Sequence, residues 1–400
     1  MIAHALLVLA LQGREPVPGV YPTGKAGIYV GIEAEPADSR TIQYFDPQTR
    51  RLGTLRPTSG GSFETTDRPV VTYTLAVPSI PVEEQPFTVG DTGGDLGVSL
   101  WHAASVAKRP TIVLVHGADD ETRDMGFIIP YFVSHGLNVV TYDQRGTGRS
   151  AGNWRYTSPR SKADDVIAIL ASLQGNVYCD SRQFGLWGFS NGAWVAPIVA
   201  TRYPIAFLIL KSPSAESIAE NVLYEIEGSL RETTQFSDAQ IASAIAFERL
   251  LLTSVATNEN WDAANAALAS ARTQPWFPYM RIPPGLTIPP PAPVLAGLQA
   301  ALIYDPTATL EQVHTPTLAL FGTLDKNVAT ADSEMRLRDD FRAAGNQSLT
   351  IRVFANADHT LTATATGFED QPLTPRRLVA GYPDGVIDWL RSRGIPTISL

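Results

Sequence analysis

Short apolar runs that alternate with helical stretches occupy most of the chain after Leu96. The runs read as buried strands at residues 111–115, 137–142, 184–187, 206–211, 317–321 and 349–354, and the stretches between them read as helices at residues 125–135, 163–173, 193–200, 333–344 and 377–393. Strands that alternate with helices form a mostly parallel sheet, because each helix carries the chain back along one face of it. The alternation therefore predicts an α/β fold with helices on both faces of the sheet.

A second region, residues 17–95, lacks this alternation and contains short β-type runs with many Gly, Pro and Thr residues. Residues 41–45 and 50–55 flank a proline-containing turn and predict a β-hairpin. Residues 78–86, PSIPVEEQP, are typical of a linker or a sheet edge before the main domain. We expect a small β-rich N-terminal region that carries no chemical motif.

The alternation is interrupted after Pro213. Residues 215–299 contain amphipathic helical stretches, such as residues 238–252, and end in the proline- and aromatic-rich segment PWFPYMRIPP. We therefore expect the α/β domain to comprise residues 96–214 and 300–400, with residues 215–299 as an inserted helical cap.

Composition and charge exclude several classes of protein. The 400 residues are 44% hydrophobic and 18% charged, as in ordinary globular proteins. A formal net charge of −9 without a basic cluster argues against a nucleic-acid partner. Cys179 is the only cysteine, which excludes disulfides within the chain and metal sites built from cysteines.

Residues 1–16 include an apolar stretch at residues 5–11 that is too short to span a bilayer. Its length suits the hydrophobic segment of a signal peptide, although no Lys or Arg precedes it. Two readings stay open: an exported protein with a cleaved signal peptide, or a cytoplasmic protein in which the stretch is an ordinary buried strand. No other segment reaches the roughly 18 apolar residues of a membrane helix, so we expect no integral membrane segment.

The segment GFSNG lies where the apolar run at residues 184–187 ends and an apolar helix begins. A serine at such a strand-to-helix corner forms the nucleophile elbow G-x-S-x-G, in which Gly188 and Gly192 let the helix cross close to the strand. Ser190 is therefore a candidate nucleophile. Because a Gly-rich turn matches this short pattern by chance, the other members of a serine-based site must be found elsewhere in the chain.

A serine hydroxyl needs a base to take its proton, and the base needs a carboxylate to hold its tautomer. On an elbow fold the three residues follow in the order Ser, Asp or Glu, and His. His359 is the candidate base, because the other five histidines lie before Ser190 or upstream of the strand that delivers the acid. Asp325, four residues beyond strand 317–321, is the candidate acid, with a helix N-cap as its alternative role. Its rival Asp358 adjoins His359 and would have to fold back to reach the imidazole.

Two backbone N–H groups are expected to stabilise the oxyanion of a tetrahedral intermediate. One belongs to Asn191, which follows the nucleophile at a helix N-terminus. The other is expected from Ala118, because Gly117 allows the turn after strand 111–115 to bend. His116 is expected to hold this turn by hydrogen bonding and not to act as the base.

The residues LVHGA, YDQRGTGRS, GFSNG, FGTLDKNV and NADH occur in this order. With these motifs the chain resembles the α/β-hydrolase superfamily from about Leu96 to the C-terminus. Within the superfamily it is similar to bacterial serine esterases and acylaminoacyl-peptidase-like hydrolases that carry a helical cap. It departs from relatives in two respects: the turn motif is HGA and not HGGG, and the β-rich N-terminal region is too short for a propeller. The resemblance implies a serine hydrolase that needs no metal or organic cofactor.

The favoured function is hydrolysis of a carboxylic ester through an acyl-enzyme, with a small-molecule ester or acyl compound as substrate. A peptidase or an acyltransferase would use the same three residues. A binding protein that keeps this fold without catalysis is the remaining alternative.

The inserted cap follows strand 206–211 and so emerges at the carboxyl edge of the sheet, beside Ser190. Its last segment offers four large side chains as candidates for a substrate pocket: Trp276, Phe277, Tyr279 and Met280. The alternative is that these side chains pack the cap against the rest of the protein.

Overall fold

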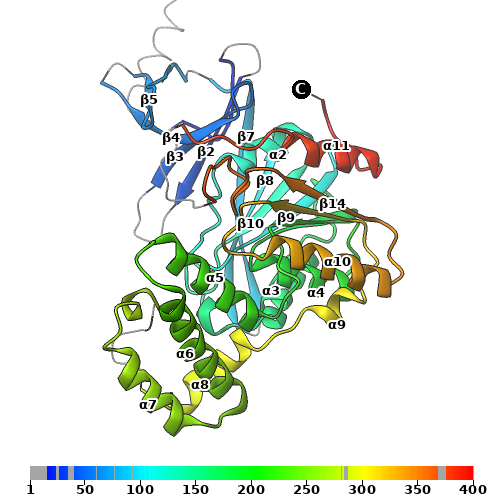
Figure 1. Cartoon of the computed structure of the whole chain (residues 1–400). Helices are drawn as coiled ribbons and strands as arrows, with labels where there is room; N and C mark the ends of the chain where they lie inside the picture. The colour runs from blue at the N-terminus through cyan, green and yellow to red at the C-terminus, as the bar shows by residue number, and fades with distance from the viewer. Residues whose placement is uncertain are drawn as a thin grey trace, which may run out of the picture.

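The fold is seen in a computed structural model of the chain (Figure 1). It describes residues 16–23, 27–34, 40–59, 61–75, 77–91, 93–105, 107–280, 282, 287–367 and 375–399. The apolar stretch at residues 5–11, interpreted as a signal peptide or a buried strand, lies outside the described residues. Within the described residues the strands form one sheet in the order β14-β13-β12-β11-β9-β10-β8-β7-β1-β2-β3-β4-β5-β6.

The α/β half of the sheet contains the strands predicted from the apolar runs. They are β8 (Gly94–Ala103), β9 (Arg109–Val115), β10 (Asn138–Tyr142), β11 (Cys179–Phe189), β12 (Phe207–Lys211), β13 (Thr317–Gly322) and β14 (Leu349–Phe354). Strands β9 to β14 pair in parallel, and β8 is antiparallel to β10. The predicted mostly parallel sheet is confirmed.

Helices cover both faces of this half of the sheet. They are α2 (Ile128–Ser134), α3 (Pro159–Ser172), α4 (Gly192–Arg202), α10 (Thr330–Ala343) and α11 (Asp384–Ser392). Side chains of α2 and α11 pack into one hydrophobic core, and those of α3, α4 and α10 into another on the opposite face (Figure 1). A short 3₁₀ helix, η1 (Trp154–Tyr156), lies between β10 and α3.

The N-terminal half of the sheet is antiparallel. Its strands are β1 (Gly19–Tyr21), β2 (Ile28–Ala34), β3 (Arg40–Asp46), β4 (Arg51–Pro57), β5 (Phe63–Thr65), β6 (Thr72–Tyr73) and β7 (Ile80–Asp91). Strands β3 and β4 form the predicted hairpin. The halves join because β7 pairs with both β1 and β8.

The interpretation of residues 78–86 as a linker or a sheet edge is wrong, because most of this segment lies in β7, which has a paired strand on each side. Val82 and Val89 of β7 are buried, so the strand is held by packing as well as by pairing. Pro81 and Pro86 lie inside this strand, because a strand tolerates a proline where no backbone N–H is needed for pairing.

Two predicted helices begin later in the chain than their sequence pattern indicates. Helix α2 begins at Ile128 and not near residue 125, because Gly126 has φ +64°, a left-handed conformation outside the helical region. Helix α11 begins at Asp384 and not at residue 377. The backbone N–H of Leu378, on the preceding segment, donates instead to the Arg50 carbonyl at 2.9 Å.

Helices between β12 and β13 form a separate lobe (Figure 1). They are α5 (Ile218–Glu232), α6 (Asp238–Thr257), α7 (Trp261–Ala271), η2 (Phe277–Met280) and α8 (Ala292–Leu302), whereas the short helix α9 (Thr307–Leu310) that follows them packs with α4 and α10 against the sheet. Helices α5 and α6 both begin with a capping box, in which Ser217 pairs with Glu220 and Ser237 with Gln240. The lobe has its own hydrophobic core.

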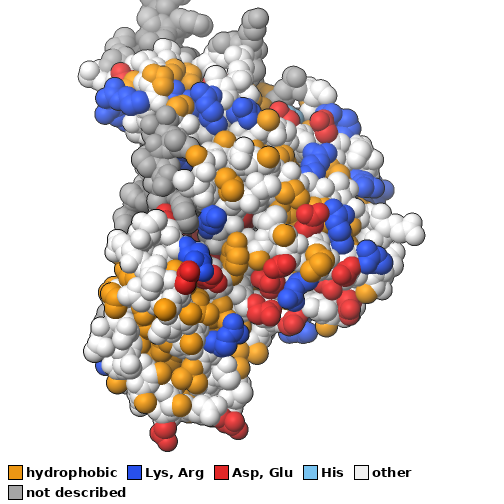
Figure 2. Space-filling view, viewed as in Figure 1, with side chains coloured by type: hydrophobic (Ala, Val, Ile, Leu, Met, Phe, Trp, Pro, Cys, Tyr) orange, Lys and Arg blue, Asp and Glu red, His pale blue; other side chains and the backbone are white. Residues whose placement is uncertain are grey.

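Apolar side chains gather on the visible surface of this lobe (Figure 2). Within the described residues one helix, α6, is long and apolar enough to cross a membrane, with a mean hydropathy of 1.3 over an 18-residue stretch. A core helix of a globular domain has the same features, and Ile241, Ala244 and Phe247 of α6 pack into the core of the lobe.

Candidate active site

Ser190 stands at the corner between β11 and α4, where the backbone is strained. Its φ is +51°, in the left-handed region that side chains rarely adopt. A Cβ on Gly188 would lie 2.5 Å from the Gly192 carbonyl oxygen, and one on Gly192 would lie 2.3 Å from that of Val115. Both glycines are therefore required by the close approach of α4 to the sheet, as the elbow pattern predicts.

The imidazole of His359 is bound by the carboxylate of Asp325. Nδ1 of His359 lies 2.8 Å from Oδ2 of Asp325, and both residues are buried. The other carboxylate oxygen, Oδ1, accepts the backbone N–H groups of Asn327 at 2.8 Å and Val328 at 2.9 Å. The carboxylate is thus fixed on one side by its own turn and faces the imidazole on the other.

The loop that carries His359 lies beside the C-terminal ends of β11, which leads into Ser190, and of the next strand, β12. The Ser190 N–H donates to the Lys211 carbonyl at the end of β12, at 3.0 Å. The next residue, Ser212, donates its hydroxyl to the His359 carbonyl at 2.6 Å. The rings of Phe189 and His359 are 5.1 Å apart between centroids. These contacts bring the predicted nucleophile and base to one edge of the sheet.

The Asp358 carboxylate accepts its hydrogen bonds from the loop that follows it. Its Oδ1 accepts the backbone N–H groups of Thr360 and Thr362, each at 2.9 Å, and the Thr360 hydroxyl at 2.8 Å. Asp358 therefore shapes the loop that follows it, whereas the contact with the imidazole is made by Asp325.

The two predicted oxyanion donors follow β9 and β11, which are neighbouring parallel strands. Asn191 has helical backbone angles at the N-terminus of α4, and Ala118 follows the end of β9. Within the described part of the chain, neither backbone N–H donates to another residue. The N-terminal end of the α4 dipole favours negative charge near Asn191, and an oxyanion hole formed by the two N–H groups stays a prediction.

His116 holds the turn after β9. Its Nδ1 lies 2.8 Å from Oε2 of Glu121, and its Nε2 contacts the Tyr142 carbonyl at the end of the neighbouring β10. The side chain of Gln144 donates to the Gly117 carbonyl at 3.2 Å. Because both ring nitrogens of His116 have partners in the structure, we infer that its role is to hold this turn.

The N-terminal sheet also holds the loop that follows Ala118. No sequence pattern predicts this contact. The Gly126 N–H donates to the Ile32 carbonyl at 2.9 Å, and the Phe127 N–H donates to Oε1 of Gln43 at 3.0 Å. A Cβ on Gly31 would lie 2.1 Å from the Gly126 carbonyl oxygen, so the two backbones touch. No local sequence signal marks Gln43, because its partner lies 84 residues away.

The four residues predicted to line a substrate pocket lie in the helical lobe. Trp276 is 1% exposed, and its ring is 5.9 Å from that of Phe247 in the core of the lobe, where Met280 is also buried. Phe277 packs against the same core. Tyr279 is 39% exposed. These are packing contacts, and a role in a pocket stays a prediction.

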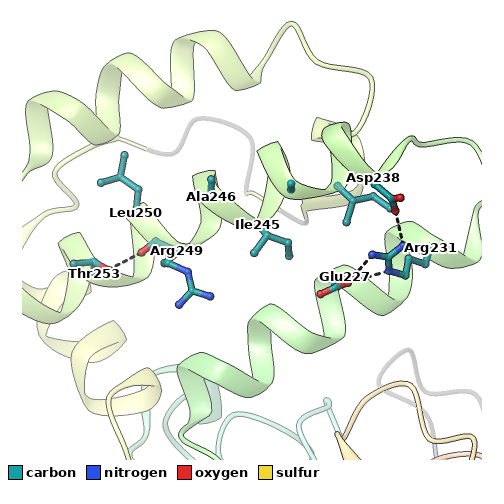
Figure 3. Close-up of a pocket in the computed structure, with 10 residues that line it drawn as sticks. Glu227, Arg231, Asp238, Ile245, Ala246, Arg249, Leu250 and Thr253 are labelled. Atoms are coloured by element: carbon teal, nitrogen blue, oxygen red, sulfur yellow. Dashed lines mark hydrogen bonds and ion pairs between the residues drawn. The ribbon is translucent and has the colours of Figure 1, made fainter.

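Two cavities help to locate where a ligand has room. One of about 600 Å³ lies between α5 and α6 and contains none of the candidate site residues (Figure 3). Arg231 bridges Glu227 and Asp238 along its rim at 2.9 Å each (Figure 3). Another of about 580 Å³ lies between the N-terminal sheet and the loops after Ala118 and His359. None of the candidate catalytic or oxyanion residues lines the second cavity either, but Asp119 and Thr360, which directly follow Ala118 and His359 in the chain, do.

Comparison with known proteins agrees with a hydrolase of the esterase and peptidase type. Residues 107–259 match the family described as "Serine aminopeptidase, S33". Acyltransferase drtE of Aspergillus calidoustus is 29% identical over 109 residues, which are 26% of this chain and 35% of that protein. The bifunctional esterase/perhydrolase DCH of Acinetobacter calcoaceticus is 32% identical over 97 residues, 24% of this chain and 32% of that protein. The matches span about a third of the length of these relatives.

Solved structures with a similar chain path include hydrolases. The Pyrococcus furiosus esterase Pf2001 aligns with 14% identity and a TM-score of 0.47, covering 78% of this chain and 91% of that one. A puromycin-hydrolyzing peptidase of Mycobacterium tuberculosis aligns with 16% identity and a TM-score of 0.46, covering 83% of this chain and 43% of that one.

Proposed function

We propose that this chain, which is a member of the α/β-hydrolase superfamily, is a serine hydrolase that cleaves carboxylic esters through an acyl-enzyme. The observation that carries the proposal is the contact between Asp325 and His359 at the sheet edge where Ser190 occupies a strained corner. Backbone strain of this kind persists only where the surrounding structure imposes it, and it clusters at functional sites.

In the acylation step, Oγ of Ser190 attacks the ester carbonyl while Nε2 of His359 takes the hydroxyl proton. The carbonyl π electrons move to the oxygen, which accepts hydrogen bonds from the Ala118 and Asn191 N–H groups. The intermediate collapses, the bond to the alcohol breaks, and His359 returns the proton to the departing oxygen. Asp325 holds the imidazole in the required tautomer and stabilises its protonated form.

Water completes the cycle by the same steps. His359 takes a proton from the water, whose oxygen attacks the acyl carbon, and the second tetrahedral intermediate releases the carboxylic acid and the Ser190 hydroxyl. No electrons are gained or lost overall. The reaction therefore needs only the ester, water and the three side chains.

An acyltransferase is the second candidate, supported by the similarity to acyltransferase drtE. An alcohol or amine would then replace water in the second step. A peptidase is the third candidate, supported by the family description, and it would use the same acyl-enzyme with an amine as the leaving group.

The test combines an active-site probe with a substrate panel. A fluorophosphonate should label Ser190 of the wild type, because only an activated serine reacts. Ser190→Ala should lose labelling and ester hydrolysis while its melting temperature stays the same. Ser243→Ala, an exposed serine on α6, is the matched control and should retain both.

Running p-nitrophenyl esters, peptide anilides and an added acceptor alcohol in parallel assigns the reaction class. Hydrolysis of esters in preference to anilides, with no transfer product, supports an esterase. Wild-type protein that is not labelled, or Ser190→Ala that keeps ester hydrolysis within tenfold of wild type, would refute the proposed function.

A further inference from the structure

A lysine on the neighbouring helix contacts the residue that follows the candidate nucleophile. Nζ of Lys162, in α3, donates to Oδ1 of Asn191 at 2.9 Å. Asn191 forms no side-chain hydrogen bond that caps its own helix, so Lys162 supplies the contact that orients this side chain. The lysine thus acts on the residue whose backbone N–H is the predicted oxyanion donor.

The surroundings of the ammonium group are unusual for a lysine near a protein surface. Nζ lies 5.3 Å from the ring centroid of Trp154 in η1, so the aromatic face is a second partner. In the described part of the chain Lys162 forms no ion pair. Loss of surrounding water lowers the pKa of Lys162, and the charge of Asp165, one turn along α3, opposes this shift in part. Asp165 is itself paired with Arg145, whose Nε lies 2.8 Å from Oδ2 of Asp165.

Trp154 connects this lysine to the other predicted oxyanion donor. Its indole N–H donates to Oδ1 of Asp120 at 2.6 Å, and Asp120 stands two residues after Ala118. The Arg155 guanidinium donates two hydrogen bonds to the same carboxylate, at 2.9 and 2.8 Å. A chain of contacts therefore runs from Asn191 through Lys162 and Trp154 to the loop of Ala118.

We propose that Lys162 is a positioning residue for the oxyanion hole: its ammonium group fixes Asn191 against η1 and adds positive charge beside the two N–H donors. The inference rests on the proposed hydrolase function and extends it to a residue with no part in the bond-breaking steps. Lys162 forms no ion pair in the described part of the chain, and the nearby anion Asp165 is held by Arg145, so the charge of the ammonium group is only partly offset and can act on the developing oxyanion.

The pKa of Lys162 makes this role testable by pH. Loss of surrounding water lowers the pKa of the ammonium group to about 8. The charged groups around it are Asp165 on its own helix, Arg145 bound to Asp165, and the Asp120 and Arg155 pair beyond Trp154. Lys162 is therefore charged below about pH 8 and neutral above it, and kcat should fall as the pH rises through this value.

The experiment compares kcat, KM and the pH profile of wild type with Lys162→Met and Lys162→Arg. Methionine keeps the hydrocarbon stem and removes the charge and the donor, so kcat at pH 7 should fall by about tenfold, less than the 10²–10³ of a deleted oxyanion donor. KM should change little, because the loss concerns the transition state. Lys162→Met should also lose the decline of kcat near pH 8, and Lys162→Arg, which stays charged, should keep activity to higher pH.

Lys108→Met, which removes an exposed lysine, is the matched control and should behave as wild type. Fluorophosphonate labelling separates the two proposals: labelled Ser190 in Lys162→Met, at a reduced rate, supports both. If wild type is labelled and active while Lys162→Met keeps the wild-type kcat and the same pH profile, the inference about Lys162 is wrong and the proposed function stands. If wild type is not labelled, the hydrolase function fails, and the role of Lys162 fails with it.

Discussion

Oδ2 of Asp325 lies 2.8 Å from Nδ1 of His359, while Oδ1 of the same carboxylate accepts two backbone N–H groups of its own turn. The acid is therefore oriented by the fold before any substrate binds. The carboxylate at Nδ1 holds the imidazole proton on that nitrogen, so that Nε2 carries the lone pair that the proposed base needs.

Asp325→Asn should lower kcat by about 10⁴-fold, because an amide in this position favours the wrong imidazole tautomer. The melting temperature should change much less than kcat, since asparagine keeps an oxygen for the two backbone donors. Steady-state kinetics on a p-nitrophenyl ester measure the effect. Asp358→Asn, on the loop that carries His359, is the matched control, and a larger loss there than in Asp325→Asn would reverse the choice of acid.

The N-terminal sheet should contribute to catalysis through Gln43. Gln43→Ala removes the acceptor of the Phe127 N–H, which lies 3.0 Å from Oε1, in the loop that follows Ala118. An unsatisfied donor costs about 1–3 kcal/mol, so the free energy of unfolding should fall by that amount. We expect kcat to fall as well, because the loop that presents the Ala118 N–H loses an anchor.

Denaturant unfolding and ester kinetics on the same preparations test this prediction. Arg56→Ala, which removes an exposed side chain of β4 from the same sheet, is the control and should alter neither quantity appreciably. A Gln43→Ala protein with wild-type stability and wild-type kcat would show that the N-terminal sheet is not coupled to the site.

The strands and the elbow follow from local sequence patterns, whereas the contacts between distant segments do not. Strand β14 is predicted at its observed bounds because the apolar run ends where the polar loop to His359 begins. Gly188 and Gly192 mark the elbow because backbone contact leaves no room for a Cβ. The contact of Lys162 with Asn191 joins residues 29 positions apart and depends on how α3 packs beside α4, which no local pattern encodes.

The helical lobe contains a carboxylate that should make stability depend on pH. Oε2 of Glu248 is buried and, among the described residues, has no hydrogen-bond partner, and burial raises the pKa of Glu248 to about 7. Between the ordinary value of 4.5 and about 7 the folded protein binds more protons than the unfolded chain. The stability associated with this proton is fully present below pH 4.5 and is lost as the pH rises through 7.

Glu248→Gln should remove this dependence, because glutamine is neutral at every pH. Between pH 5 and pH 8 the free energy of unfolding of the wild type should fall by about 1–3 kcal/mol relative to the variant. Chemical denaturation at pH 5, 6, 7 and 8 provides the measurement, with exposed Glu259→Gln as the control. Parallel curves for wild type and Glu248→Gln would contradict the prediction.

The aromatic segment of the lobe provides the last prediction, because its side chains differ in burial. Trp276 is 1% exposed and packs on Phe247, whereas Tyr279 is 39% exposed. Removing a buried tryptophan costs about 3–5 kcal/mol, so Trp276→Ala should lower the melting temperature clearly and reduce kcat/KM by a similar factor for all acyl lengths. Tyr279→Ala should change the melting temperature little.

A C2 to C12 ester series with each variant separates packing from substrate contact. If Trp276→Ala instead keeps the wild-type melting temperature and shifts preference toward longer acyl chains, by up to about 1–3 kcal/mol per methylene, Trp276 lines the acyl pocket.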